Sequence, residues 1–213
     1  MIEAIIFDMD GVLVDSEAFI LKAAIEMFAE RGVTALPEDF KPFIGAGEDR
    51  YIGGVCQKYS IKFDSQRDKK RVYDIYLDLI KGNLQPLAGV HEFIRQCKIK
   101  KLKCAVASSA DLVKVEANLL EIGLPLNTFN AVINGQDVKN KKPAPDIFLL
   151  AAKKLDVNIK DCIVVEDAVN GVEAAKLAGA RCLGLTTSFS AKQLHKADWI
   201  APNLGAISID VLS

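Results

Sequence analysis

Short apolar runs that alternate with helix-like patterns are the feature of this sequence that most constrains its fold. The runs are rich in Ile, Val, Cys and Ala, which is typical of core strands in a parallel sheet. Strands that alternate with helices form βαβ units with right-handed crossovers. We therefore predict an α/β fold built on a doubly wound, Rossmann-like parallel sheet. The predicted strands are residues 4–7, 102–107, 131–133, 162–165, 182–185 and 199–201.

Two of the helices predicted between these strands carry clear boundary signals. Val113, Ala117 and Leu120 form the apolar stripe of one helix, and Gly123 ends it. Pro145 suits the first turn of the other helix.

The stretch from residue 16 to residue 85 contains no convincing strand. Apolar residues recur at helical spacing over 19–28 and again over 72–80, with Ser16 as a possible N-cap. Prolines and glycines divide the chain between these stripes into short helices and turns. We expect an all-helical cap domain formed by residues 16–85, inserted into an α/β core formed by residues 1–15 and 86–213.

The composition excludes several classes of function. The 213 residues include 27 basic and 28 acidic ones, a net charge of −1, so the chain has no electrostatic footprint for nucleic acid or an anionic membrane. No apolar stretch approaches the length of a membrane span, and no signal peptide is apparent. Five widely spaced cysteines without a Cys-x-x-Cys pair favour buried thiols in a reducing compartment over zinc or disulfides. We expect a cytoplasmic monomer without nucleic-acid or membrane partners.

Two carboxylates, Asp8 and Asp10, follow directly on the first predicted strand, and Gly11 comes after them. Side chains alternate along a strand, so both carboxylates would leave its carboxyl end on the same side. Like charges brought together in this way repel, and the arrangement persists most readily if a cation neutralises them. The alternative is an ordinary acidic turn, because Asp and Gly are common turn residues.

Three further polar groups follow other predicted strands or the loops after them. They are the pair Ser108 and Ser109, the residue Lys142, and the pair Glu166 and Asp167. A parallel sheet brings such strand ends to one rim, where open α/β sheets bind ligands. Each group also has a simpler interpretation: Ser108 or the acidic pair could cap a helix, and a single lysine is usually solvated. Their joint occurrence at strand ends favours a common site.

The chemistry of this set is coherent. Oxygen ligands from three or four carboxylates suit Mg²⁺, which also keeps waters and a substrate phosphate. A hydroxyl and a lysine supply a donor and a positive charge for the oxygens of a transferring phosphoryl group. One carboxylate can act as nucleophile and form an aspartyl phosphate, while a second acts as general acid and then general base.

The ordered set resembles the motifs of the haloacid dehalogenase superfamily over essentially the whole chain. The first motif is Phe-Asp-Met-Asp-Gly-Val-Leu-Val-Asp-Ser, and Ser108, Lys142 and Glu166-Asp167 match the other three. The helical insert is similar to the small cap of the subgroup that includes β-phosphoglucomutase and phosphoglycolate phosphatase. The resemblance implies that Asp8 is the nucleophile and Asp10 the acid and base. It also implies that Mg²⁺ is held by Asp8, the main-chain carbonyl of Asp10 and Asp167, with Glu166 at or next to the metal.

Several residues depart from the mutase pattern. Ile20 replaces a histidine, and Ala110, Asp111 and Leu112 replace polar groups that bind a second phosphate in the mutases. We therefore predict a Mg²⁺-dependent phosphatase of a small phosphorylated metabolite. A β-phosphoglucomutase-like enzyme and a catalytically idle binding module are the alternatives. The candidate substrate-binding residues are Ser108, Ser109, Lys142 and, from the glycine-bounded loop of the cap, Arg50.

Overall fold

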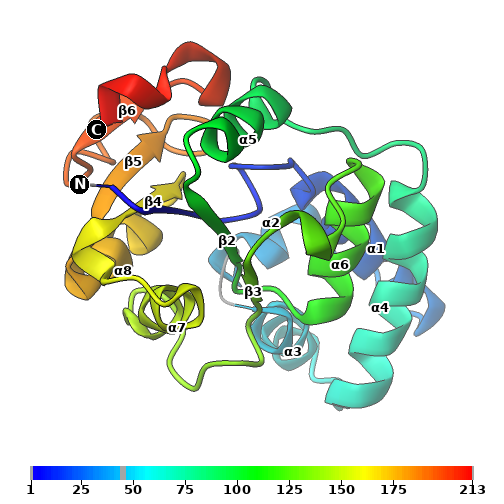
Figure 1. Ribbon diagram of the computed structural model, residues 1–213. Coiled ribbons are helices and arrows are strands. Elements are labelled where there is room, and N and C mark those ends of the chain that lie inside the picture. The colour runs from blue at the N-terminus through cyan, green and yellow to red at the C-terminus, as the bar shows by residue number, and fades with distance from the viewer. Residues whose placement is uncertain (1, 44–46, 213) are drawn as a thin grey trace.

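The structure is a computed structural model that describes residues 2–43 and 47–212. Its centre is a six-stranded, all-parallel sheet with the strand order β3-β2-β1-β4-β5-β6 (Figure 1). The predicted α/β class and doubly wound sheet are confirmed. The strands are β1 (Ala4–Phe7), β2 (Lys103–Ala107), β3 (Ala131–Ile133), β4 (Cys162–Glu166), β5 (Arg181–Leu185) and β6 (Trp199–Ala201).

The register of the three central strands determines what meets at the carboxyl edge of the sheet. Phe7 at the end of β1 lies opposite Val106 of β2 and Val165 of β4. The residue after Phe7 therefore leaves the sheet between the ends of β2 and β4. The backbone amide of that residue, Asp8, donates to the carbonyl of Val165 at 2.9 Å.

Helices cover both faces of the sheet, because side chains alternate between the two faces and all four residues of β1 are buried. Ala4 and Ile6 pack with α7 (Asp146–Leu155) and α8 (Val169–Ala178) on one face. Ile5 and Phe7 face the opposite side, where α5 (Val90–Ile99) and α6 (Leu112–Glu121) pack. Figure 1 shows α7 and α8 on the side of the sheet away from α5.

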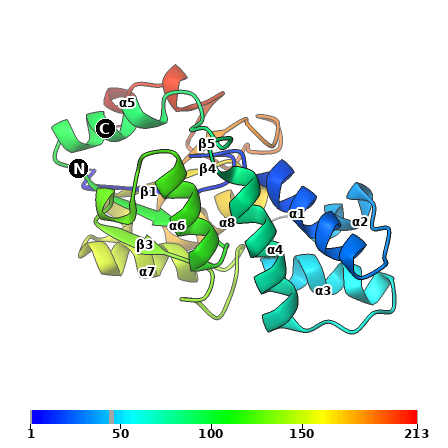
Figure 2. The ribbon, with the colours of Figure 1, turned by 90° about the vertical axis from the view of Figure 1, so that its right-hand side faces the viewer.

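The stretch between β1 and α5 is helical, as predicted. It forms α1 (Glu17–Glu30), α2 (Pro37–Phe40), α3 (Glu48–Lys58) and α4 (Ser65–Ile80). Figure 2 shows these four helices grouped at one end of the molecule, with α4 beside α6. Their behaviour as a separate cap domain stays a prediction. Short 3-10 helices lie at Lys41–Phe43, Leu126–Thr128, Ile159–Asp161, Leu204–Ala206 and Ile209–Leu212.

The helix predicted around Val113 forms as α6, but its buried face is not its apolar stripe. Val113 and Leu120 are 40% and 65% exposed, whereas Lys114 and Asn118 are buried together with their apolar neighbours. The helix is rotated relative to its apolar stripe because both polar side chains find buried partners. Asn118 accepts a hydrogen bond from the hydroxyl of Tyr76 on α4, and the partner of Lys114 lies in the site described below.

All five cysteines are buried and free. Within residues 2–43 and 47–212, we find no helix with both the length and the apolar character needed to cross a bilayer.

A buried carboxylate fastens α4 to the end of α1. Asp68 of α4 is 2% exposed and accepts hydrogen bonds from Arg31 Nη1 at 3.0 Å and Arg67 Nε at 2.9 Å. It also accepts the backbone amide of Asp64 at 2.9 Å. Because Arg31 follows directly on α1, this contact adds a charged link to the packing of α1 on α4.

We predict that Asp68→Asn lowers the free energy of unfolding by about 2 kcal/mol, because an amide does not neutralise the two arginines. Asp74→Asn in the same helix is the matched control. The side chain of Asp74 is 44% exposed and pairs with Lys70 at the surface, so its loss should cost about 0.5 kcal/mol or less. Urea unfolding followed by circular dichroism measures both values, and equal losses would contradict the role assigned to Asp68.

Candidate active site

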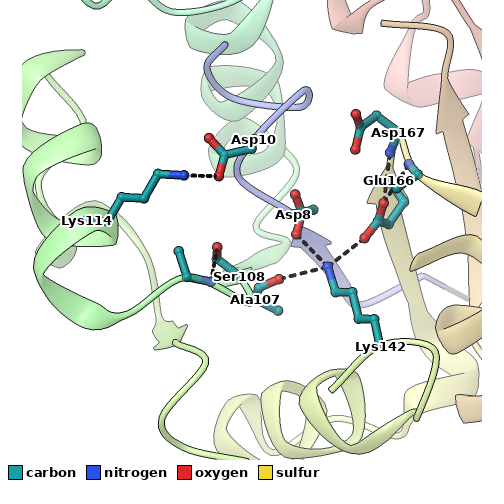
Figure 3. Close-up of polar contacts among 10 residues, drawn as sticks. Asp8, Asp10, Ala107, Ser108, Lys114, Lys142, Glu166 and Asp167 are labelled. Atoms are coloured by element: carbon teal, nitrogen blue, oxygen red, sulfur yellow. Dashed lines mark hydrogen bonds and ion pairs between the residues drawn. The ribbon is translucent and has the colours of Figure 1, made fainter. Parts of the chain in front are cut away.

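A cavity of about 700 Å³ opens at the carboxyl edge of the sheet and has the size of a small-molecule site. The structure brings the sequence-predicted groups together there, although they come from four separate strand ends and loops (Figure 3). The predicted residues that line the cavity are Asp8, Asp10, Ser108, Ser109, Lys142, Glu166 and Asp167.

Lys142 lies at the centre of this group. It precedes α7, and its Nζ is 2.5 Å from Asp8 Oδ1 and 2.6 Å from Glu166 Oε1. A longer contact of 3.4 Å reaches the carbonyl of Ala107. Burial alone would lower the pKa of Lys142, but the charges of Asp8 and Glu166 outweigh it and raise that pKa. Lys142 is therefore a fixed ammonium and not the usual solvated lysine.

The carboxylates of Asp8 and Asp167 are both buried and both hard to ionise. Burial raises the pKa of Asp8 to about 7, although Lys142 acts in the opposite direction. Burial, followed by the charges of Glu166 and Asp8, raises the pKa of Asp167 to about 8. Two acids that resist ionisation side by side form an environment that a divalent cation would stabilise.

The backbone around Gly11 leaves room for Asp167. Gly11 has a φ of +75°, and a Cβ atom there would overlap with Asp167 Oδ2. Within the described residues, no three acidic, histidine or cysteine side chains form a metal cluster on their own. Mg²⁺ in phosphoryl-transfer sites usually takes only one or two protein carboxylates, with waters and substrate phosphate completing its shell. Asp8, Asp167 and the main-chain carbonyl of Asp10 fit such a set.

Both carboxylate oxygens of Glu166 accept hydrogen bonds. Oε1 accepts from Lys142, and Oε2 accepts the backbone amides of Asp167 and Ala168, each at 2.9 Å. Through these hydrogen bonds Glu166 orients the side chain of Lys142 and the first residues of the loop before α8. Its predicted role as a direct metal ligand stays a prediction.

The carboxylate of Asp10 turns toward the helices and away from Lys142 (Figure 3). Oδ2 is 2.8 Å from Lys114 Nζ, and Oδ1 accepts a hydrogen bond from the hydroxyl of Ser16. The sequence predicts Ser16 as the cap of α1. Ser16 occupies the N-cap position, but its side chain makes no capping hydrogen bond, because its hydroxyl donates to Asp10 instead.

Sequence reasoning missed Lys114. It is 3% exposed, projects from α6 into the cavity and carries a pKa that Asp10 and other acids raise against the effect of burial. The only sequence signal was a lysine and an asparagine four residues apart, at positions 114 and 118, which place both on one face of a helix.

Ser108 is 2% exposed, and its oxygen accepts the amide of Ala110 at 3.2 Å. It does not cap α6, whose N-cap position is Asp111. The hydroxyl hydrogen of Ser108 is thus available for a ligand. Asp111 makes no cap bond either, because its carboxylate pairs with Lys69 of α4 at 2.8 Å.

The predicted substrate-binding residue Arg50 lies outside the cavity. It is exposed on α3 and is not among the cavity-lining residues. The described residues that α3 contributes to the lining are Glu48 and Tyr51. Gly45 and Ala46, which begin the predicted substrate loop, fall outside the described residues.

Comparison with known proteins identifies the family of the chain and supports its fold. Residues 5–185 match the family described as haloacid dehalogenase-like hydrolase. The chain is 44% identical over 221 residues to Protein SUPPRESSOR OF QUENCHING 1, chloroplastic, of Arabidopsis thaliana, with 100% of this chain and 21% of that protein covered. It is 33% identical over 205 residues to the Phosphorylated carbohydrates phosphatase of Thermotoga maritima, with 93% of each covered. The crystal structure of CbbY from Rhodobacter sphaeroides in complex with phosphate has a TM-score of 0.85 at 27% identity, with 96% of each chain covered.

The chain therefore belongs to the haloacid dehalogenase-like hydrolases, and the family and enzyme class predicted from its motifs are confirmed. This chain spans about a fifth of its Arabidopsis relative. The compartment expected from the cysteines stays a prediction, since that relative is named chloroplastic.

We predict that Gly171→Ala lowers the turnover of a test ester such as p-nitrophenyl phosphate by at least about tenfold, because small misplacements at a reacting centre are costly. Gly171 lies in α8, and a Cβ atom there would overlap with Glu166 Oε1. The carboxylate of Glu166 must therefore move, and Lys142 loses its ion pair with it.

Gly179→Ala, at the C-cap of the same helix, is the control for this substitution. Gly179 has a φ of +87°, and a Cβ atom added there would have nothing within 4 Å. This variant should therefore lose about 1 kcal/mol of stability through backbone strain and keep its activity. Full activity in Gly171→Ala would mean that the position of Glu166 does not matter for turnover.

Proposed function

We propose that this chain is a Mg²⁺-dependent phosphatase that hydrolyses a phosphorylated sugar or a related small metabolite through an aspartyl phosphate. The observation that carries the proposal is the Asp8 carboxylate, held by Lys142 at 2.5 Å and followed two residues later by a second acid, Asp10. The names of relatives such as the Thermotoga maritima phosphatase support the same reaction class.

In the first half of the proposed reaction, a carboxylate oxygen of Asp8 attacks phosphorus in line with the leaving oxygen. The bond between phosphorus and the leaving oxygen breaks, and Asp10 donates its proton to that oxygen. Lys142 and the hydroxyl of Ser108 bind the phosphoryl oxygens. A bound Mg²⁺ would be held by Asp8, Asp167 and the main-chain carbonyl of Asp10, and would neutralise charge on those oxygens.

In the second half, Asp10 is a carboxylate and removes a proton from a water molecule. The water oxygen attacks phosphorus, and the bond to Asp8 breaks. Inorganic phosphate leaves, while Asp8 returns as a carboxylate and Asp10 as an acid. In the structure both oxygens of Asp10 accept, one from Lys114 and the other from Ser16, which is the carboxylate form that this second half needs.

Hydrolysis is preferred over transfer between two positions of a sugar bisphosphate. Ile20, a cavity-lining residue that is 3% exposed, cannot donate a hydrogen bond to such a substrate. Asp111, where a mutase offers a group for the second phosphate, carries a negative charge and is paired with Lys69. We also propose that the protein acts as a cytoplasmic monomer.

Asp8→Asn should abolish turnover, to below about 1% of the wild-type rate, because an amide is a poor nucleophile. The fold should persist, which the same thermal midpoint within a few degrees would establish. Asp74→Asn, an exposed carboxylate of α4, is the control and should keep full activity. Residual activity of more than a few per cent in a homogeneous Asp8→Asn preparation would remove Asp8 from the role of nucleophile.

Phosphorus NMR of one reaction mixture separates the candidate functions. We predict that the protein with Mg²⁺ releases inorganic phosphate from p-nitrophenyl phosphate and small sugar phosphates. We predict that it forms no glucose 6-phosphate from β-glucose 1-phosphate, even with a bisphosphate activator. Excess chelator should stop phosphate release, since Mg²⁺ is needed to balance the buried acids. Glucose 6-phosphate without free phosphate would favour the mutase, and no turnover of any ester would favour the binding module.

A further inference from the structure

Two hydroxyl side chains line the cavity but have no part in the proposed phosphoryl chemistry. They are Thr187 and Ser188, in the loop that follows the carboxyl end of β5. The backbone amide of Thr186 donates to the carbonyl of Ala201 in β6 at 2.9 Å, which anchors the start of this loop to the sheet. The loop therefore presents both hydroxyls at the sheet edge that carries the proposed site.

Thr187 restrains the backbone of the turn that follows Asp10. Its Oγ1 atom donates to the carbonyl of Gly11 at 2.5 Å, which joins two residues 176 positions apart in the sequence. The backbone amide of Gly11 donates in turn to the carbonyl of Val14 at 2.7 Å. A trans peptide is planar, so a fixed Gly11 amide also fixes the direction of the Asp10 carbonyl. The two hydrogen bonds thus restrain both peptide units around Gly11, and one of these units carries a proposed ligand of Mg²⁺.

Ser188 contacts the second proposed ligand. Its hydroxyl donates a hydrogen bond to the carboxylate of Asp167. The two groups also converge on Gly11, because a Cβ atom built on that glycine would lie 2.0 Å from Asp167 Oδ2 and 3.0 Å from Ser188 Oγ. Lys142 directs its ion pairs to the other two buried acids of the site (Figure 3). The Asp167 carboxylate therefore takes its orientation from the loop after β5 rather than from that lysine.

A simpler interpretation is that these hydroxyls only complete the polar surface of a loop, since Thr187 and Ser188 are both exposed residues. Ser190 in the same loop has such a local role, because its amide and its hydroxyl both donate to Oε1 of Gln193, at 3.1 and 2.8 Å. The partners of Thr187 and Ser188 belong instead to the loops after β1 and β4. These long-range contacts favour a role in the site over a local one.

We propose that Thr187 and Ser188 are positioning residues of the metal site. Ser188 orients the carboxylate of Asp167, and Thr187 restrains the turn that presents the carbonyl of Asp10, so both oxygen ligands are held in place before Mg²⁺ binds. This inference rests on the proposed Mg²⁺-dependent function and adds residues that set the affinity for the metal. Loss of a hydrogen-bond partner that orients a metal ligand typically lowers metal affinity by about 10–100-fold.

The affinity of the substrate-free protein for Mn²⁺ tests this inference without a measurement of turnover. Mn²⁺ takes the same oxygen ligands as Mg²⁺, and its free ion is counted by electron paramagnetic resonance. We expect Ser188→Ala and Thr187→Val each to raise the Kd for Mn²⁺ by about tenfold, because neither new side chain can donate a hydrogen bond. Ser188→Thr and Thr187→Ser retain the hydroxyl and should stay within about threefold of the wild type.

Ser190→Ala is the matched control within the same loop. Ser190 is exposed, its hydroxyl donates to Gln193, and it is not among the described residues that line the cavity. Its substitution should leave the Kd for Mn²⁺ unchanged. Asp167→Asn should remove the binding, which places the counted ion in the proposed site, and displacement by Mg²⁺ shows that both ions share it. Thermal unfolding of each variant establishes that the proteins compared are folded.

The outcomes separate this inference from the proposed function. An unchanged Kd in folded Ser188→Ala or Thr187→Val would remove that residue from the role, and binding that survives in Asp167→Asn would overturn the role of both. Equal losses in Ser190→Ala, or in the variants that keep the hydroxyl, would also overturn it, because the loop and not its hydrogen bonds would then set the affinity. A wild-type protein that binds Mn²⁺ but releases no phosphate from any ester with Mg²⁺ would overturn the phosphatase and leave the positioning role. No binding of Mn²⁺ to the wild type would overturn both.

Discussion

The contact of Lys142 with Asp8 and Glu166 is the interaction on which the site depends. Both carboxylates are buried at the ends of adjacent parallel strands, β1 and β4, where nothing else of opposite charge reaches them in the described structure. Two uncompensated acids at this position would be costly to ionise, and one ammonium between them offsets much of that cost. The loop before α7 therefore has to deliver its lysine for the sheet edge to hold an ionised nucleophile.

Asp10 connects this edge to the helices beyond it. Its carboxylate is bound by Ser16 just before α1 and by Lys114 of α6. Along α6, Asn118 continues the contact toward α4 through the hydroxyl of Tyr76. The proposed general acid thus lies where the core and the helical segment meet, and its orientation depends on both.

The cavity consequently has two electrostatic halves. One half concentrates the Lys142 ammonium and the Ser108 hydroxyl, which suit the oxygens of a phosphoryl group. The other half is lined by the carboxylates of Glu17 and Glu48.

The sequence by itself determined the sheet, the helical nature of the insert and the residues that converge at the carboxyl edge. Those features follow from local periodicity and from the rule that parallel strands end at one rim, and Asp8, Ser108, Lys142 and Asp167 meet there accordingly. Only the tertiary structure decided which polar side chains are buried. Lys114 pairs with a residue 104 positions away, so α6 turns its lysine inward against its own apolar stripe. Glu48 lines the cavity where Arg50 was expected, because the phase of α3 directs residue 48 inward and residue 50 to solvent. Burial of a charge depends on a distant partner, and no local pattern in the sequence records where that partner will lie.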